Sequence, residues 1–268
     1  MKRTTMKVKE TLLKGKCSFS KNGEVHLSVP SSWGEMNEEQ LRYTLWLLTS
    51  NYSENAVRMY LLMRFADMKV DHLSDKGWIC HGEGKESKPF AITTGQFVEM
   101  LRHFDYVFED GSCDNRISVI DGCKAMSLEL YELKFGNYLL IENLFQAYLG
   151  DPENTELLVE IAWILYQVPD KKRSKWKISS EELYGVFLWY RHFKKMCQKD
   201  FPHLFKPSAG GADSLTQLEA MNAQLRALTD GDVTKEELVK VQDALRALTE
   251  LDAKAKEAEE LQKQLKKK

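Results

Sequence analysis

The chain has 268 residues, of which 43% are hydrophobic and 29% are charged, with a formal net charge of −2 at pH 7. This length and apolar content suffice for a hydrophobic core, in one large domain or in one domain with an appendage. The near-neutral charge excludes a general electrostatic attraction to nucleic acid or to an anionic membrane.

The termini and the cysteines bear on the cellular compartment. The basic segment 1–16 has no apolar run of signal-peptide length, and no stretch of about 18 apolar residues predicts a membrane span. The five cysteines are scattered and form no CxxC pair, which is typical of reduced thiols. We therefore expect a cytoplasmic protein without a membrane segment.

The first part of the chain predicts a hairpin followed by two helices. An Asn-Gly dipeptide between two alternating runs favours a type I′ turn and a β-hairpin over 16–29. Asn37 with Gln40 predicts a capped helix, and Ser53 begins a second one a few residues later, so the two should pack as an antiparallel pair. The first helix carries four large apolar side chains, Leu41, Leu45, Trp46 and Leu48.

The middle of the chain mixes short strands with one helix. Glycines and a proline interrupt residues 71–94, where segments 78–80 and 90–92 predict two paired strands. Thr94 is the expected cap of a helix that contains Phe97. Residues 128–133 alternate between apolar and polar side chains and predict a further strand.

Three strongly apolar helices are predicted over 137–149, 154–168 and 180–199. The middle one has only a narrow polar stripe, and a helix that is apolar nearly all round is buried. We expect it to form the centre of the core, with Trp163 as a principal core residue. Ser179 and Glu182 predict a capping box at the start of the third helix.

Residues 206–213 predict a linker, because Pro207 and Gly210-Gly211 interrupt a helix. No aromatic residue or cysteine occurs beyond it, so the last segment cannot build a thick core alone. The expected fold is mainly α with small β-hairpin elements. It consists of a helical globular body over 1–205 and a charged two-helix hairpin over 214–268.

The predicted hairpin has an apolar stripe on each helix. Asp230-Gly231 ends the first helix, and Thr234 with Glu237 predicts a capping box for a second, which runs to the end over about 50 Å. The shorter first helix covers about half of the second, so residues 250–265 need another partner. The expected interaction residues are Leu245, Leu248, Leu251, Leu261 and Leu265. The sequence LRALT occurs at 225–229 and 245–249, through internal duplication or through similar composition.

The sequence contains no complete motif for a cofactor, metal or catalytic nucleophile. Residues 82–87 resemble a phosphate loop but lack its first glycine and its Ser or Thr. Residues 110–121 place oxygen-bearing side chains at EF-hand positions without the turn glycine or the final glutamate. The possible zinc ligands Cys80, His81, Cys113 and Cys123 lack the spacing of close ligand pairs. We therefore expect no cofactor, no metal and no enzymatic activity, although a site assembled from distant residues is an open alternative.

A basic segment at 171–177 is the main candidate for nucleic-acid contact. Cations with an interleaved Trp could hold a phosphate backbone and stack a base. The alternative, which we favour, is a solvated loop whose Trp packs on the core. The residues concerned are Lys171, Lys172, Arg173, Lys175 and Trp176.

Most of the chain resembles an uncharacterised group of proteins from the structural modules of tailed phages and prophages. The resemblance is carried by residues 28–48, 130–150, 156–169, 185–205 and 228–260. It implies a role in tail morphogenesis, as a tail assembly factor or assembly chaperone in the cytoplasm of a bacterial host cell. The implied partners are phage tail components, such as the tape-measure protein, or further copies of the chain. The leading hypothesis is thus a non-enzymatic assembly factor. Its rivals are a nucleic-acid-associated protein and an enzyme.

Overall fold

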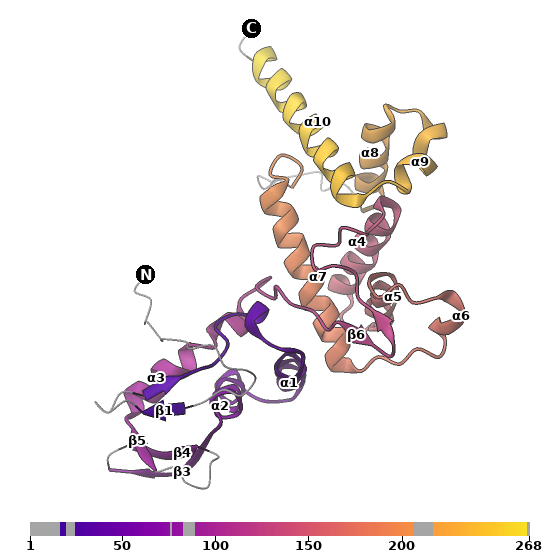
Figure 1. Cartoon of the computed structure of the whole chain (residues 1–268). Helices are drawn as coiled ribbons and strands as arrows, with labels where there is room; N and C mark the ends of the chain where they lie inside the picture. Colours follow the sequence, from indigo (N-terminus) through magenta and orange to yellow (C-terminus); the bar gives the residue numbers. More distant parts are fainter. Residues whose placement is uncertain (1–16, 20–24, 76, 83–88, 206–216, 267–268) are drawn as a thin grey trace. The chain divides into compact units, whose positions relative to one another are not determined.

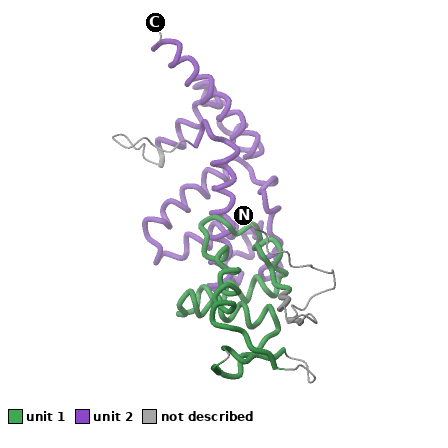
Figure 2. The backbone as a smooth tube through the Cα atoms, turned by 90° about the vertical axis from the view of Figure 1, so that its left-hand side faces the viewer, with its two compact units in different colours: residues 1–115 green, residues 116–268 purple. Residues whose placement is uncertain are grey.

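The computed structural model describes residues 17–19, 25–75, 77–82, 89–205 and 217–266 (Figure 1). The chain divides into two compact units, residues 1–115 and 116–268 (Figure 2). The described residues are mainly helical with short antiparallel strands, so the predicted fold class is confirmed. None of the described helices is long and apolar enough to cross a membrane.

The boundary between the units differs from the one that composition predicts. The expected linker, 206–213, lies outside the described residues. The predicted body is instead divided at residues 115 and 116, and the C-terminal helices belong to the second unit. They do so because they pack against helix α4, described below.

The first unit contains the predicted helical pair. Helices α1 (Glu38–Thr49) and α2 (Glu54–Phe65) begin at the expected caps. Asn37 and Gln40 form a reciprocal capping box, and the Ser53 side chain accepts from the backbone N–H of Ala56. Helix α3 (Thr94–Arg102) begins one residue earlier than predicted, because Thr93 rather than Thr94 is its cap. A short 3-10 helix, η1 (Trp33–Glu35), precedes α1, and another, η2 (Asp105–Phe108), follows α3. The buried apolar side chains of the pair include Leu41, Leu45, Leu47, Leu61, Leu62 and Phe65.

The strands of the first unit form two antiparallel sheets. Strands β1 (Cys17–Phe19) and β2 (Val25–Leu27) pair as the predicted hairpin, whose turn lies outside the described residues. Strands β3 (Met68–Ser74), β4 (Gly77–Gly82) and β5 (Phe90–Ile92) form the second sheet in that order. The predicted pairing of the last two is confirmed, and β3 is an additional strand that periodicity did not indicate.

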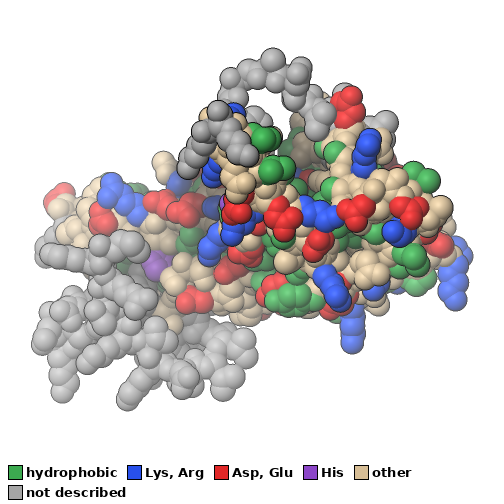
Figure 3. Space-filling model, turned by 90° about the horizontal axis from the view of Figure 1, so that it is seen from above, with side chains coloured by type: hydrophobic (Ala, Val, Ile, Leu, Met, Phe, Trp, Pro, Cys, Tyr) green, Lys and Arg blue, Asp and Glu red, His purple; other side chains and the backbone are tan. Residues whose placement is uncertain are grey.

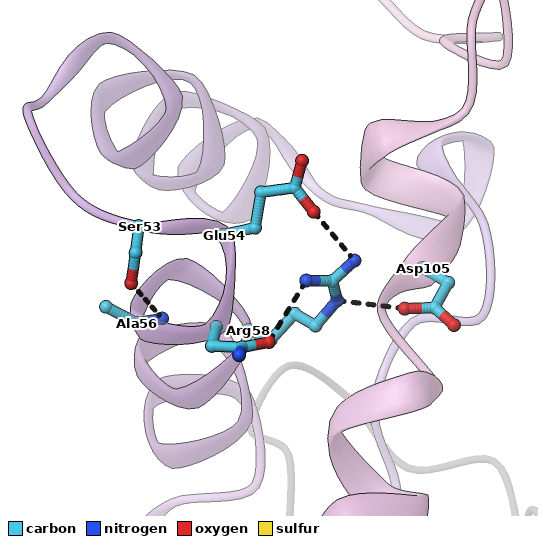
Figure 4. A network of polar contacts seen from close by, with 6 residues as sticks. Ser53, Glu54, Ala56, Arg58 and Asp105 are labelled. Carbon is cyan, nitrogen blue, oxygen red and sulfur yellow. Dashed lines mark hydrogen bonds and ion pairs between the residues drawn. The ribbon is translucent and has the colours of Figure 1, made fainter.

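One arginine connects α2 to η2 in the first unit (Figure 4). The Arg58 guanidinium donates to Glu54 one turn away, at 3.2 Å, and to Asp105 of η2, at 2.8 Å. It also lies 4.3 Å from the centre of the Phe108 ring. These contacts hold η2 against the helical pair.

The second unit begins with a two-stranded hairpin, β6 (Val119–Ile120) and β7 (Cys123–Lys124). The strand predicted over 128–133 is absent: this segment consists of turns, and the φ angle of Leu130 is 58°. Leu130 and Leu133 are instead buried within those turns. The alternation of apolar and polar residues therefore does not indicate a strand in this segment.

Helices α4 (Phe135–Gly150), α5 (Glu156–Leu165), α6 (Asp170–Arg173) and α7 (Ser180–Asp200) follow. The three long ones match the predicted helices, and the capping box of α7 is present. Helix α5 contacts both α4 and α7, as expected of a core helix. Trp163, however, is only half-buried, whereas Trp189 of α7 is 1% exposed.

The C-terminal region consists of α8 (Gln217–Thr229), η3 (Val233–Lys235), α9 (Glu236–Lys240) and α10 (Ala244–Leu265). The prediction of one continuous second helix is wrong. The chain leaves the helix between α9 and α10, where the Gln242 carbonyl accepts from Phe135 N and Ala244 N donates to the Leu133 carbonyl, both at 2.9 Å. Tertiary hydrogen bonds replace helical ones at this break.

New caps accompany the interrupted helix. Asp243 caps α10 by accepting from Arg246 N at 2.8 Å. Asp232 accepts from Thr234 N, so the predicted capping box of Thr234 and Glu237 does not form. Gly136 of α4 permits the close approach of α9, since a Cβ atom there would lie 3.1 Å from Lys240 Cβ.

Candidate functional site

The five predicted interaction residues on α10 have different surroundings. Leu248 and Leu251 are 0% and 4% exposed, and Leu245 is half-buried. Leu261 and Leu265 are 58% and 64% exposed. The apolar stripe is therefore divided into a covered part and an uncovered part.

Polar contacts attach α10 to its own unit on both sides. Lys254 Nζ donates to Asp230 Oδ1 and to the Ala227 carbonyl, both at 2.7 Å, and its hydrogen bond to Asp230 lowers the pKa of that carboxyl. Asp252 accepts from the backbone of His203 at 2.7 Å, and Glu259 lies 3.3 Å from the His203 ring nitrogen. The helix is thus held as far as Glu259.

Only the last residues of α10 extend beyond these contacts. Residues 260–266, which we call the α10 tip, are all exposed. In Figure 1 this end of α10 points away from α8 and α9. The uncovered segment is therefore shorter than the predicted one, 250–265, because the chain around residue 203 covers its first part.

The basic segment 171–177 does not present its aromatic ring. Trp176 is 8% exposed, and its indole N–H donates to the Ile120 carbonyl at 3.0 Å. Lys172 donates to the Asp121 carbonyl, and Arg173 forms an ion pair with Asp170 at 3.0 Å. Only Lys171 and Lys175 of the predicted nucleic-acid set are exposed side chains without such a contact. The Trp176 ring, which would have to stack on a base, is thus packed within the unit, as the alternative of a solvated loop predicts.

In the loop 110–121, two side chains that an EF-hand would need bind backbone groups outside the loop instead. Asp114 Oδ1 accepts from Gly34 N at 2.7 Å, and the Ser112 hydroxyl donates to backbone carbonyls. Within the described ranges no group of three or more His, Cys, Asp or Glu is placed to hold a metal ion. The phosphate-loop-like segment 82–87 lies mostly outside the described residues.

The cysteines considered as zinc ligands are buried separately. Cys80 and Cys113 belong to the first unit and Cys123 to the second. Burial raises the pKa of Cys80 to about 11 and that of Cys113 to about 12. Such thiols stay protonated at neutral pH, and a protonated thiol is a poor metal ligand or nucleophile.

A charged cluster lies between α4 and α7 in the second unit. Glu142 is 8% exposed and accepts from the Tyr190 hydroxyl at 2.6 Å and from Lys194 Nζ. Burial, with the adjacent carboxylate, raises the pKa of Tyr190 far above its usual value and that of Cys197 to about 12. The carboxylate has partners for both oxygens, as a buried charge requires.

A groove of about 580 Å³ lies beside α4 and α5, entirely within the second unit. We call it the α4–α5 groove. Its apolar wall includes Leu140 of α4, which is 45% exposed. Its full lining is Met126, Glu132, Asn137, Leu140, Leu144, Glu160, Trp163, Ile164, Gln167, Val168 and Arg173.

The groove combines this apolar wall with charged groups. Glu132 accepts from the hydroxyl and the backbone N–H of Ser127, and the first of these bonds is the main reason that its pKa is lowered. The Arg173 guanidinium lies 5.3 Å from the centre of the Trp163 ring. Trp163 Nε1 and Arg173 Nε are buried without a hydrogen-bond partner among the described residues. The sequence suggested no such site, since Trp163 reads as a core residue.

Periodicity likewise did not indicate an exposed aromatic cluster on α1, α2 and the turn that joins them. Tyr43 and Trp46 stack at 5.9 Å, and Tyr52 lies 5.1 Å from Tyr60. Trp46 and Tyr52 are 46% and 45% exposed, so Trp46 differs from Leu45 of the same helix, which is buried. Aromatic side chains of this kind are enriched in protein–protein interfaces.

Comparison with known proteins adds no family to this description. No family model matches the chain, and no curated protein and no solved structure matches it.

Proposed function

We propose that this protein is a non-enzymatic assembly factor that acts through protein–protein contacts made by the α10 tip. The observation that carries the proposal is the exposure of Leu261 and Leu265, at 58% and 64%, on a helix that is otherwise attached to its unit. These leucines are four residues apart and so lie on one helix face. Burying each against a partner contributes about 1.5–3 kcal/mol.

The surface around this helix end also supports a contact role. Figure 3 shows the molecule from the side at which α10 ends, and basic and acidic side chains are interspersed there with apolar ones. Charged residues that flank an apolar stripe keep it in solution until a partner covers it. The exposed aromatic pair Trp46 and Tyr52 offers a further apolar surface on the first unit.

We propose tail morphogenesis in a phage or prophage as the biological setting, with tail components or further copies of the chain as partners. The support is the sequence resemblance over residues 28–48, 130–150, 156–169, 185–205 and 228–260. The nucleic-acid alternative has no comparable support, since the Trp176 ring is packed inside the second unit.

A complementation experiment tests the proposal. The gene is deleted from a phage or prophage that carries it, and wild type or Leu261→Asp/Leu265→Asp is supplied from a plasmid. We expect wild type to restore tailed particles, counted by electron microscopy, and the variant to fail.

The matched control is Gln262→Asp/Gln264→Asp, which adds the same two charges to the α10 tip and keeps both leucines. It should restore tailed particles. Equal complementation by the leucine variant and the control would remove the tip from the function, and normal tails without the gene would refute the morphogenesis role.

A further inference from the structure

We infer that the α10 tip of one copy binds in the α4–α5 groove of a second copy. The inference rests on the proposed function, since it names a partner for the same α10 tip. It is carried by two complementary surfaces on the second unit. One is an exposed helix end with two leucines, and the other is a groove with an exposed apolar wall.

The groove has room for side chains of the tip. The tip, residues 260–266, is about 10 Å long as an α-helix. The groove volume of about 580 Å³ lies within the usual range of binding pockets. Leu140, at 45% exposure, gives its wall an apolar side chain that can contact Leu261 and Leu265. Those three leucines would become covered together.

The charges of the two surfaces are also complementary. Beside its leucines the tip carries two exposed cations, Lys263 and Lys266, and one exposed carboxylate, Glu260. The groove is lined by the carboxylates of Glu132 and Glu160, while its one cation, Arg173, is already paired with Asp170. The lowered pKa of Glu132 keeps that carboxylate ionised at neutral pH. Opposite charges at the rim of a contact favour its formation and fix its orientation.

The tip cannot fill the groove of its own chain. Lys254 holds α10 to Asp230, and Asp252 and Glu259 hold it to the segment at His203. No residue of α10 belongs to the groove lining. The contact must therefore be made between two copies.

A contact between two different surfaces of the same chain is heterologous. Each copy keeps a free tip or a free groove after the first contact, so association continues into a ring or an open filament. The buried area is small, and an interface of this kind is weak and concentration-dependent. Assembly would then occur where many copies are gathered together.

Mixing two defective variants tests this arrangement. Leu261→Asp/Leu265→Asp removes the tip, and Leu140→Asp removes the groove wall at an exposed position. In sedimentation velocity over a range of concentrations, wild type should self-associate, and each variant should do so about a hundredfold more weakly. An equal mixture of the variants should give a one-to-one dimer, because one supplies the groove and the other the tip.

Several outcomes would overturn the inference. Wild type could remain monomeric at all concentrations. Alternatively, Leu140→Asp could associate as strongly as wild type, as a tip-to-tip contact requires. Gln262→Asp/Gln264→Asp adds the same two charges but keeps both leucines, so it should associate more strongly than the leucine variant. Circular dichroism should show that all variants are folded. If association is absent but the tip variant still fails in complementation, the proposed function stands with a different partner.

Discussion

The beginning and the end of α10 carry leucines of the same stripe and have opposite surroundings. Leu248 and Leu251 near its start are buried, whereas Leu261 and Leu265 at its end are exposed. Both pairs belong to one apolar stripe with three- and four-residue spacing. The difference arises opposite the helix, where α4 and α8 contact its first part.

The two copies of the pentapeptide LRALT also differ in which of their residues are buried. In α8 its first leucine, Leu225, and its threonine, Thr229, are buried. In α10 the second leucine, Leu248, is buried, and the threonine, Thr249, is exposed. The same five residues therefore present different faces to the core, because the packing partner selects the face.

The largest expected effect compares the two parts of α10 directly. Leu248→Asp places a charge in the core and should lower the free energy of unfolding by about 4–5 kcal/mol or more. Leu261→Asp should change it by less than about 0.5 kcal/mol. Chemical denaturation followed by circular dichroism measures both values. Equal effects would mean that the two parts of the helix are covered alike.

A second comparison separates two tryptophans of the second unit. Trp189 is 1% exposed, and its indole N–H donates to the Leu128 carbonyl at 2.9 Å. Trp189→Ala should cost about 3–5 kcal/mol, measured by the same unfolding experiment. Trp163→Ala removes a half-buried groove residue and should cost about 1–2 kcal/mol. The reverse order would restore Trp163 to the centre of the core.

The third prediction compares a buried ion pair with an exposed one. Lys194→Met leaves the Glu142 carboxylate buried without its cation, which costs about 3–5 kcal/mol for a fully buried pair. We expect the lower end, since the Lys194 side chain is 24% exposed. Thermal unfolding should show a clear loss for this variant.

Two controls sharpen this comparison. Glu142→Gln/Lys194→Met removes both charges and should recover most of the lost stability. Lys254→Met removes the cation from the exposed pair with Asp230 and should have little effect. A large loss in Lys254→Met would show that its contact with the Ala227 carbonyl matters more than its exposure suggests.

The last comparison concerns covered thiols and pH. An exposed thiol ionises near pH 9.0, whereas burial raises the pKa of Cys113 and Cys197 to about 12. The folded state thus holds these protons more tightly. The contribution of these two thiols to the free energy of unfolding is complete below pH 9 and is lost as the pH rises toward 12.

Alkylation measures the same protection. At pH 8, iodoacetamide should label Cys113 and Cys197 slowly in the folded protein and fast in urea, as followed by mass spectrometry. Fast labelling of the folded protein would mean that these side chains are not covered.

Local sequence signals identified most helices. The capping box of Asn37 and Gln40 and that of Ser179 and Glu182 begin helices where expected. Such caps act between neighbouring residues, so they can be read without knowledge of the fold. The pairing of β4 with β5 was predictable for a similar reason, since only a short segment separates them.

The failures occur where distant segments decide the structure. The break between α9 and α10 depends on hydrogen bonds to Leu133 and Phe135, about a hundred residues away. The segment 128–133, where a strand was expected, forms turns in which Leu130 and Leu133 are buried. Periodicity reports which side chains share a face and does not report what lies opposite.

The candidate sites likewise have some features that are local in sequence and others that depend on tertiary contacts. The sequence by itself determined that α10 is an amphipathic helix with leucines along one side, because three- and four-residue spacing is a local property. Only the tertiary structure decided that Leu248 is covered and Leu261 is not, that Trp176 is buried, and that Trp163 lines a groove. Burial depends on which distant segments meet, and that meeting is set by the packing of the whole unit.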